Sequence, residues 1–186
     1  MENIINKIKS VSNQELDSLD TSYIARYNFM HPNSYFHGQS GREHYRLLMY
    51  ISTLINRGII FDVGTYRCMS AAALSFSGKN KVISYDIEQN ISTNPDILNV
   101  EYKLGDVRND ENLSKSQFIF FDVDHDGKFE KLFLDHLREI EWKGLMLCDD
   151  IYLNDPMKKW WDSISEEKID LTNVGHWSGT GLIIFK

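Results

Sequence analysis

Short apolar runs divide the chain between residues 59 and 149 into regular steps. The runs that predict strands are Ile59–Val63, Lys81–Asp86, Val100–Leu104, Phe118–Asp122 and Gly144–Asp149, of which the third is the weakest. Helical or polar segments separate them. Strands that alternate with helices predict an α/β fold, with a doubly wound, parallel sheet and right-handed crossovers.

Helical spacing and a terminal hairpin complete this pattern. Apolar residues recur at helical intervals over residues 41–57 and 128–140, and Asn154, Asp155 and Pro156 are typical of a helix start. Two more strands are expected over residues 168–174 and 180–185. The short connection between them predicts a hairpin, which would add an antiparallel strand at the C-terminal side of the sheet.

Apolar positions in the first 40 residues show no sustained helical or strand periodicity. Ile4, Ile5 and Ile8 suggest a short amphipathic helix. The rest of this segment holds aromatic and histidine side chains that could cover a ligand or simply pack on the sheet: Tyr23, Tyr27, Phe29, His31, Tyr35 and His37. We therefore expect one domain over residues 41–186 and an N-terminal cap or lid over residues 1–40, because 186 residues with 42% hydrophobic content suit a single core.

Charge and cysteine content narrow the possible partners. The net charge of −7 argues against a nucleic-acid backbone or an anionic membrane as the main partner, because both require a basic surface. A small-molecule partner fits better, and the oligomeric state is left open. Cys68 and Cys148 lie in apolar contexts, and neither a secretory leader nor a spanning apolar run is visible, so we expect a cytoplasmic protein with reduced thiols.

Residues 59–75 predict a strand, a tight turn and a helix. Gly64 can adopt backbone angles closed to other residues, and Ser70 could cap the helix. Asp62 is an acid that apolar burial alone would not select. Tyr66 occupies the place of the second glycine of a dinucleotide fingerprint, which disfavours NAD or FAD. The alternatives are a ligand-binding turn and an ordinary buried one.

Five aspartates follow the strands in the same way. Asp62, Asp86, Asp122 and Asp149 close apolar runs, and Asp106 follows the third strand; we call these the strand-end aspartates. The carboxyl ends of parallel strands share one edge, where converging carboxylates repel each other unless cations or hydrogen-bond donors are bound among them. A functional cleft is predicted there. Asp86 lies 24 residues after Asp62, near the offset of the acid that takes ribose hydroxyls in nucleotide-binding folds.

The turn after the first strand resembles motif I of class I S-adenosylmethionine-dependent methyltransferases. The resemblance covers the acid at position 62, Gly64, Thr65, Tyr66, Ser70 and Ala71. It implies a Rossmann-like, seven-stranded, mostly parallel sheet and S-adenosylmethionine as cofactor. Cys68 stands where the family usually has another glycine, which leaves open a cofactor-binding module without catalysis.

The resemblance also implies roles for individual residues. Asp62 and Gly64 would face the methionine part of the cofactor, and Thr65, Tyr66 and Ser70 belong to the same binding motif. Asp86, with Ile87 beside it, would hold the ribose. Asp106 would accept from the adenine amine, with Val107 next to it, and Asp122 would also line the cofactor pocket. These ten cofactor residues are Asp62, Gly64, Thr65, Tyr66, Ser70, Asp86, Ile87, Asp106, Val107 and Asp122.

Residues 122–127 allow several interpretations. The Asp-x-Asp-x-Asp-Gly spacing copies the start of an EF-hand loop, but Phe133 stands where a bidentate Glu is required, so that interpretation fails. A strand that ends in Asp122-Val123-Asp124 also resembles the nucleophile motif of haloacid-dehalogenase-like phosphohydrolases, which remains a weaker alternative. An Asp-x-Asp pair can also mark a glycosyltransferase that binds a nucleotide sugar with a divalent ion, but nothing else in the sequence supports such a site.

Together with Asp149 and Asp150, the same stretch resembles metal-dependent O-methyltransferases. Hard cations such as Mg²⁺ take oxygen ligands, and Asp122, Asp149 and Asp150 bring three carboxylates from two strand ends. The Asp122-x-x-His125 spacing followed by an acid pair is most similar to the macrolide-sugar enzymes. The resemblance implies Mg²⁺ on these three aspartates, catalysis by Asp122 and His125, with His125 as general base, and methyl transfer to a hydroxyl of a small molecule or sugar.

Overall fold

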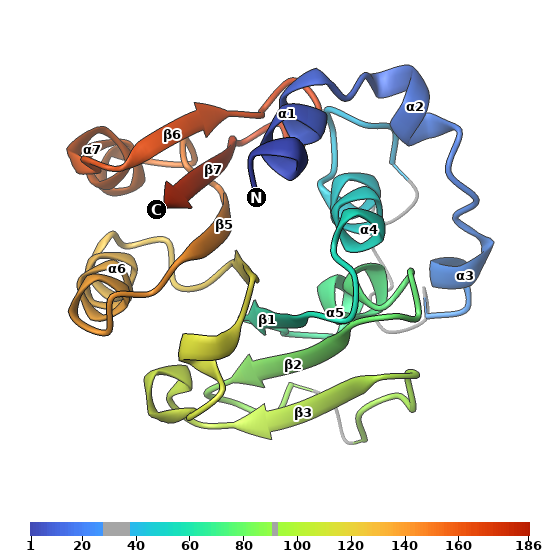
Figure 1. Ribbon diagram of the computed structural model, residues 1–186, viewed down its shortest axis with the longest axis horizontal. Coiled ribbons are helices and arrows are strands. Elements are labelled where there is room, and N and C mark those ends of the chain that lie inside the picture. The colour runs from blue at the N-terminus through green and yellow to red at the C-terminus, as the bar shows by residue number, and fades with distance from the viewer. Residues whose placement is uncertain (28–37, 91–92) are drawn as a thin grey trace.

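A computed structural model of the protein describes residues 1–27, 38–90 and 93–186. Its centre is a seven-stranded sheet in the order β3-β2-β1-β4-β5-β7-β6 (Figure 1). The strands are β1 (Ile59–Val63), β2 (Lys81–Asp86), β3 (Val100–Leu104), β4 (Phe118–Phe121), β5 (Gly144–Asp149), β6 (Glu167–Asp170) and β7 (Thr180–Phe185). The first five are parallel, whereas β7 is antiparallel to β5 and β6. The predicted fold class is confirmed.

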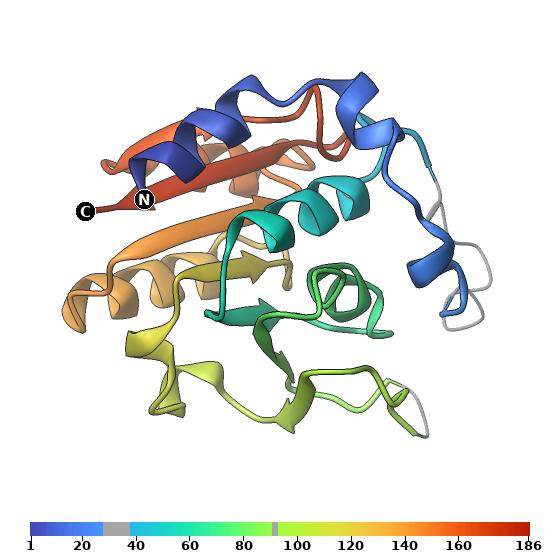
Figure 2. The same ribbon diagram turned by 45° about the vertical axis from the view of Figure 1, so that its right-hand side comes forward.

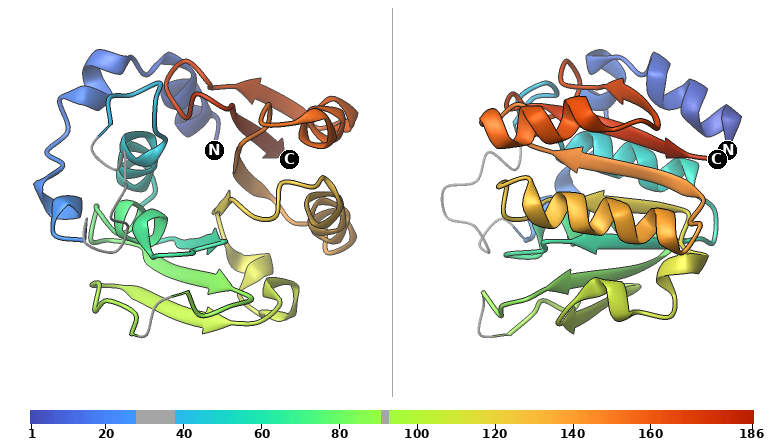
Figure 3. Two further views of the ribbon diagram at one scale, coloured as in Figure 1. Left: turned by 180° about the vertical axis from the view of Figure 1, so that it is seen from behind. Right: turned by 90° about the vertical axis from the view of Figure 1, so that its left-hand side faces the viewer.

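Helices cover both faces of this sheet. One side carries α1 (Glu2–Ser10), α2 (Asn13–Asp17), α3 (Ser22–Ala25), α4 (Tyr45–Leu54) and α5 (Met69–Leu74). The other carries α6 (Lys128–Glu139) and α7 (Asp155–Ser163), with the short 3₁₀ turns η2 (Val107–Asn109) and η3 (Leu113–Lys115) (Figures 1 and 3). Among the helices described here, none has the length and apolar character needed to span a bilayer.

The sheet is buried on both faces, which explains why its central strands are continuous apolar runs. Alternate side chains point to opposite layers. Ile60 and Phe120 pack with the α4 and α5 helices, whereas Phe61 and Phe121 pack toward α6. Phe121 stacks on Phe133 with ring centroids 4.7 Å apart, which holds α6 beside the end of β4.

The register brings the carboxyl ends of the central strands level with one another. Val63 pairs with Tyr85 of β2 and with Phe121 of β4, and Phe121 pairs with Cys148 of β5. The chain continues from β1 toward β2 and β3 on one side, and from β4 toward β5 on the other. Such a reversal of strand order opens a crevice at the carboxyl ends, where α/β sheets bind ligands.

Three expectations about the elements were wrong. Helix α4 spans Tyr45–Leu54 instead of residues 41–57, because the backbone is left-handed at Gly41 and Arg57. Strand β6 spans Glu167–Asp170 instead of residues 168–174, because Asp170 accepts hydrogen bonds from the backbone N–H and the hydroxyl of Thr172 and starts a turn. Ser70 does not cap α5. That helix begins after Cys68, whose φ of +64° is left-handed, and no side chain caps it. The predicted start of α7 is confirmed, since Asn154 accepts from the backbone N–H of Met157 at 2.9 Å.

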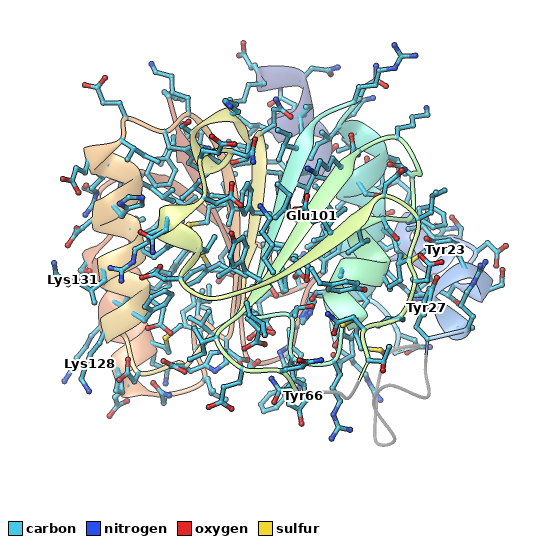
Figure 4. The ribbon with its side chains drawn as sticks, turned by 90° about the horizontal axis from the view of Figure 1, so that it is seen from below. Tyr23, Tyr27, Tyr66, Glu101, Lys128 and Lys131 are labelled. Carbon is cyan, nitrogen blue, oxygen red and sulfur yellow. The ribbon has the colours of Figure 1, made fainter. Side chains whose placement is uncertain are left out.

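The described part of the N-terminal segment is a packing layer. Ile8, Leu16 and Ile24 are fully buried in the core on the α4 side, and α1 lies along β7 in Figure 2. The Tyr23 hydroxyl lies 2.8 Å from the Ser75 hydroxyl, and Figure 4 shows Tyr23, which belongs to α3, near Tyr27. The other predicted covering residues, Phe29, His31, Tyr35 and His37, lie outside the described residues, so a lid there stays a prediction.

Candidate functional site

Gly64 brings the ends of β1 and β4 into close contact. Its φ is +89°, and a Cβ at this position would lie 1.6 Å from the carbonyl oxygen of Asp122. The backbone N–H groups of Gly64 and Thr65 both donate to the carbonyl of Tyr85, at 2.9 and 3.0 Å. Only glycine allows this approach at this backbone angle. The loop continues through Tyr66 and Cys68, which also take positive φ values, so the turn bends sharply although position 68 is not glycine.

A first pocket of about 390 Å³ opens beside this loop, within the size range of small-molecule sites. Its lining comes from the ends of β1, β2 and β4 and from the segment after β3: Val63, Gly64, Tyr66, Tyr85, Asp86, Ile87, Asn90, Gly105, Val107, Asp122, Val123, Asp124, His125 and Phe129. Tyr66 lies at the rim, 48% exposed (Figure 4). The pocket therefore brings together six of the ten predicted cofactor residues: Gly64, Tyr66, Asp86, Ile87, Val107 and Asp122.

Asp86 is held firmly at the end of β2. Its carboxylate accepts hydrogen bonds from the backbone N–H of Tyr66 at 2.8 Å and of Glu88 at 3.1 Å. The first bond joins the end of β2 to the turn at Gly64–Tyr66, which we call the glycine turn, so both sides of the pocket are fixed relative to each other. Ile87 follows directly and is 69% exposed, which offers an apolar surface at the pocket mouth.

Three of the strand-end aspartates lie outside this lining: Asp149, which lines a second pocket described below, and Asp62 and Asp106. Asp62 is fully buried, because it is the penultimate residue of β1 and its side chain points into the α5 layer, where the Ser84 hydroxyl donates to it at 2.7 Å. Burial raises the pKa of Asp62 to about 6, although the hydroxyls of Ser70, Ser84 and Thr65 lower it. Asp106 pairs with the Arg108 guanidinium at 2.5 Å, and this hydrogen bond lowers the pKa of Asp106.

A second pocket of about 450 Å³ lies on the other side of the glycine turn. It shares Gly64, Tyr66 and Asp122 with the first pocket. The remaining lining comes from the start of α4, the glycine turn and α5, the end of β5 and the turn before β7: Glu43, His44, Tyr45, Thr65, Arg67, Met69, Ser70, Asp149, Asp150 and His176. Thr65 and Ser70 thus face this second pocket and not the first.

His125 lies between two carboxylates where the pockets meet. Its Nε2 is 3.0 Å from Oδ1 of Asp122 and 3.2 Å from Oδ2 of Asp150. The backbone of His125 is left-handed, with φ of +58°, and is held by Glu130, whose carboxylate accepts its N–H at 2.8 Å. Burial is the largest single influence and lowers the pKa of His125, but the bond to Asp122 and the charges of Asp122, Asp150 and Asp149 together raise it. Burial also raises the pKa of Asp122.

Asp149 has different partners. Its Oδ2 is 3.1 Å from Nδ1 of His44 and 3.2 Å from Nδ1 of His176. Burial alone would raise the pKa of Asp149, but the two imidazoles hold it well below the usual range. Likewise, burial lowers the pKa of His176, whereas its bonds to Asp149 and Asp150 raise it to about 10. The Ser178 hydroxyl also bonds to Asp150.

Among the residues that the structure describes, two groups could therefore hold a metal ion. One is Asp122, His125 and Asp150; the other is His44, Asp149 and His176. The three carboxylates predicted to bind Mg²⁺ are divided between these groups, with Asp149 in the second. Sequence reasoning missed His44 and His176, although His44 precedes an amphipathic helix that leads to β1, and His176 lies in the turn before the strand that pairs with the end of β5.

Comparison with known proteins rests on structure alone, since no family model and no curated protein matches the sequence. A Staphylococcus aureus protein assigned as a caffeoyl-CoA O-methyltransferase matches with a TM-score of 0.61 and 14% identity over 100% of both chains. The O-methyltransferase TomG from Streptomyces achromogenes, solved with S-adenosylmethionine, matches with a TM-score of 0.60 and 11% identity over 90% of this chain and 92% of its own.

A methyltransferase from Geobacter sulfurreducens matches similarly, with a TM-score of 0.58 and 11% identity over 100% of this chain and 98% of its own. At these identities the likeness concerns the fold. It agrees with the strand order and with the antiparallel β7 described above. This chain therefore has the fold of class I S-adenosylmethionine-dependent methyltransferases.

Proposed function

We propose that this protein transfers the methyl group of S-adenosylmethionine to a hydroxyl of a small molecule or sugar. The observation that carries the proposal is the junction of the two pockets at Gly64, Tyr66 and Asp122. One pocket suits the cofactor and the other an acceptor, so that the donor and the attacking oxygen would meet beside His125. Methyl transfer depends mainly on such positioning.

The first pocket fits S-adenosylmethionine in size and in the placement of its polar groups. Asp86 would accept from the ribose hydroxyls, with Gly64 and Tyr66 along the chain of the cofactor and Ile87 and Val107 against the adenine. Asp106 would reach the adenine amine only by giving up part of its pairing with Arg108. Asp62, buried beneath the turn, would act on the methionine part through the loop that it supports. When bound in this pocket, S-adenosylmethionine would supply an electrophilic methyl group.

His125 is the proposed general base. Its imidazole is within hydrogen-bond distance of Asp122 and Asp150, so a proton taken from the acceptor hydroxyl would be stabilised on the ring by both carboxylates. Asp122 would orient the ring, and the Glu130 and Asn154 contacts to the His125 backbone would keep it in place. The displacement needs no covalent intermediate with the protein.

A divalent cation is the second part of the proposal. Asp122, Asp149 and Asp150 would hold Mg²⁺ through carboxylate oxygens, which are the ligands it prefers, and the ion would lower the pKa of the acceptor hydroxyl. Asp122 and Asp150 each offer an oxygen toward one point beside His125, and Asp149 would join them only by giving up its contacts with His44 and His176.

Calorimetric titration with S-adenosylmethionine, followed by turnover assays on catechol and sugar acceptors, tests the proposal. Formation of S-adenosylhomocysteine should fall at least 100-fold in His125→Gln, the scale of general-base catalysis, and remain unchanged in the control His136→Gln on α6. Loss of turnover in excess chelator would support the cation. Cofactor binding without turnover on any acceptor would favour the non-catalytic module, and hydrolysis of a generic phosphate ester that depends on Asp122 would favour the phosphohydrolase.

A further inference from the structure

Three side chains from distant parts of the chain converge at the back of the second pocket. His44 immediately precedes α4, Asp149 ends β5 and His176 lies in the turn before β7. Nδ1 of each histidine lies close to the same carboxylate oxygen, Oδ2 of Asp149, at 3.1 and 3.2 Å. His44 and Asp149 are buried, and only 17% of the His176 side chain is exposed.

The Nδ1 atom of His44 is the most informative part of this group. His44 is only 4% exposed, and its Nδ1 makes no hydrogen bond of acceptable geometry with any residue that the structure describes. A buried ring nitrogen without a hydrogen bond is costly in a folded protein. Nδ1 of His44 lies close to Oδ2 of Asp149 but is not aligned for a hydrogen bond with it. Two ligands that point at the same metal ion have this geometry.

The surroundings hold the group in a ligating arrangement. The Thr180 hydroxyl is 3.4 Å from Oδ1 of Asp149, which leaves Oδ2 for the two histidines. Oε2 of Glu43 is 4.0 Å from Nε2 of His176, the nitrogen opposite to the one that faces Asp149. Histidine ligands of metals commonly have a carboxylate on their second nitrogen, and Glu43 is close enough to attract this ring by its charge, although it is too far for a hydrogen bond.

We propose that His44, Asp149 and His176 form a site for a divalent transition-metal ion, with Nδ1 of both histidines and Oδ2 of Asp149 as ligands. Two imidazoles and one carboxylate suit zinc, iron, cobalt or nickel, whereas Mg²⁺ prefers oxygen ligands alone. Ligands about 2.1 Å from an ion in octahedral or tetrahedral geometry are roughly 3.0–3.4 Å apart, which matches both nitrogen–oxygen distances. This site shares Asp149 with the oxygen site proposed above, but its two histidine ligands give it a different metal preference.

The remaining coordination positions would face the second pocket, which all three residues line. If the proposed methyl transfer is correct, an oxygen of the acceptor could reach the ion there. The metal site itself does not depend on that function, because His44 and His176 have no part in the proposed cofactor binding or proton transfer; only Asp149 is shared with the proposed Mg²⁺ site.

Cobalt(II) is a suitable probe, since its visible absorption reports both binding and coordination by nitrogen. The full-length protein, freed of metal by chelator and desalted, should bind one Co²⁺ with a visible band and should release it to Zn²⁺ but not to a 100-fold excess of Mg²⁺. His44→Gln and His176→Gln should each weaken Co²⁺ binding at least 100-fold. Glu43→Gln should weaken it about tenfold, the scale for a group that orients a ligand.

His136→Gln is the matched control, because His136 lies on α6 and lines neither pocket. Circular dichroism and thermal unfolding should show that each variant is folded, and His176 offers a partly exposed position if His44→Gln is unstable. The proposal is overturned if Co²⁺ does not bind, if Mg²⁺ displaces it readily, or if the folded His176→Gln variant binds it as tightly as the native protein. Calorimetry with S-adenosylmethionine on the same samples tests the methyltransferase proposal independently.

Discussion

Replacement of Gly64 by alanine tests whether the close approach of β1 and β4 builds the site. The added Cβ would lie 1.6 Å from the Asp122 carbonyl oxygen, and a real Cβ contact is not shorter than 3.0 Å, so the two strands must separate by about 1.4 Å. Overpacking of this kind costs about 1–3 kcal/mol. The left-handed φ of +89° adds about 1–2 kcal/mol for a residue with a side chain. We therefore expect Gly64→Ala to lower the free energy of unfolding by about 2–5 kcal/mol.

Gly78→Ala separates these two contributions. Gly78 also has a positive φ, +64°, but a Cβ there would have nothing within 4 Å, so only the backbone cost of about 1–2 kcal/mol applies. Urea unfolding followed by tryptophan fluorescence gives both values. Gly64→Ala should also weaken S-adenosylmethionine binding, because the displaced residue, Asp122, lines the first pocket. Equal destabilisation by the two variants, with unchanged cofactor affinity in Gly64→Ala, would refute the reasoning.

Three further predictions follow from other contacts. Asp86→Ala should weaken S-adenosylmethionine binding about 10–100-fold, because a charged hydrogen-bond acceptor is lost, and calorimetry measures this. The control Asp135→Ala on α6 should leave the affinity unchanged. Equal affinities of the two variants would remove the assignment of Asp86 to the ribose. Asp110 loses some of its basicity in the fold: burial raises its pKa, but Lys103, Asn112 and Tyr85 lower it to about 2. Because the pKa of Asp110 is lower in the folded protein than in the unfolded chain, its ionised form stabilises the fold above about pH 4, and this contribution is lost as the pH falls toward 2. Asp110→Asn should therefore make the free energy of unfolding less dependent on pH in that window. Tyr23→Phe should lower the free energy of unfolding by about 1 kcal/mol by removing the bond to Ser75, and no change in urea midpoint would show that this contact is not formed in solution.

The sequence by itself determined the layered α/β fold. A parallel sheet buried on both faces requires continuous apolar strands, and the runs at β1, β2, β4 and β5 are of this kind. Because parallel strands end at one edge, the sequence was also sufficient to place Asp86, Asp122 and Asp149 at that edge, where Asp122 lines both pockets, Asp86 the first and Asp149 the second. Their clustering follows from connectivity and strand direction alone.

Only the tertiary structure decided what each carboxylate contacts. Asp62 is one residue short of the end of β1, and the alternation of side chains turns it into the core, while Arg108 binds Asp106. His44 and His176 are far apart in the sequence and belong to no apolar period. They meet at Asp149 because α4 packs on the sheet and because β7 runs antiparallel to β5, which returns the turn before β7 to the carboxyl end of β5. Such contacts depend on packing between elements, for which local sequence patterns carry no signal.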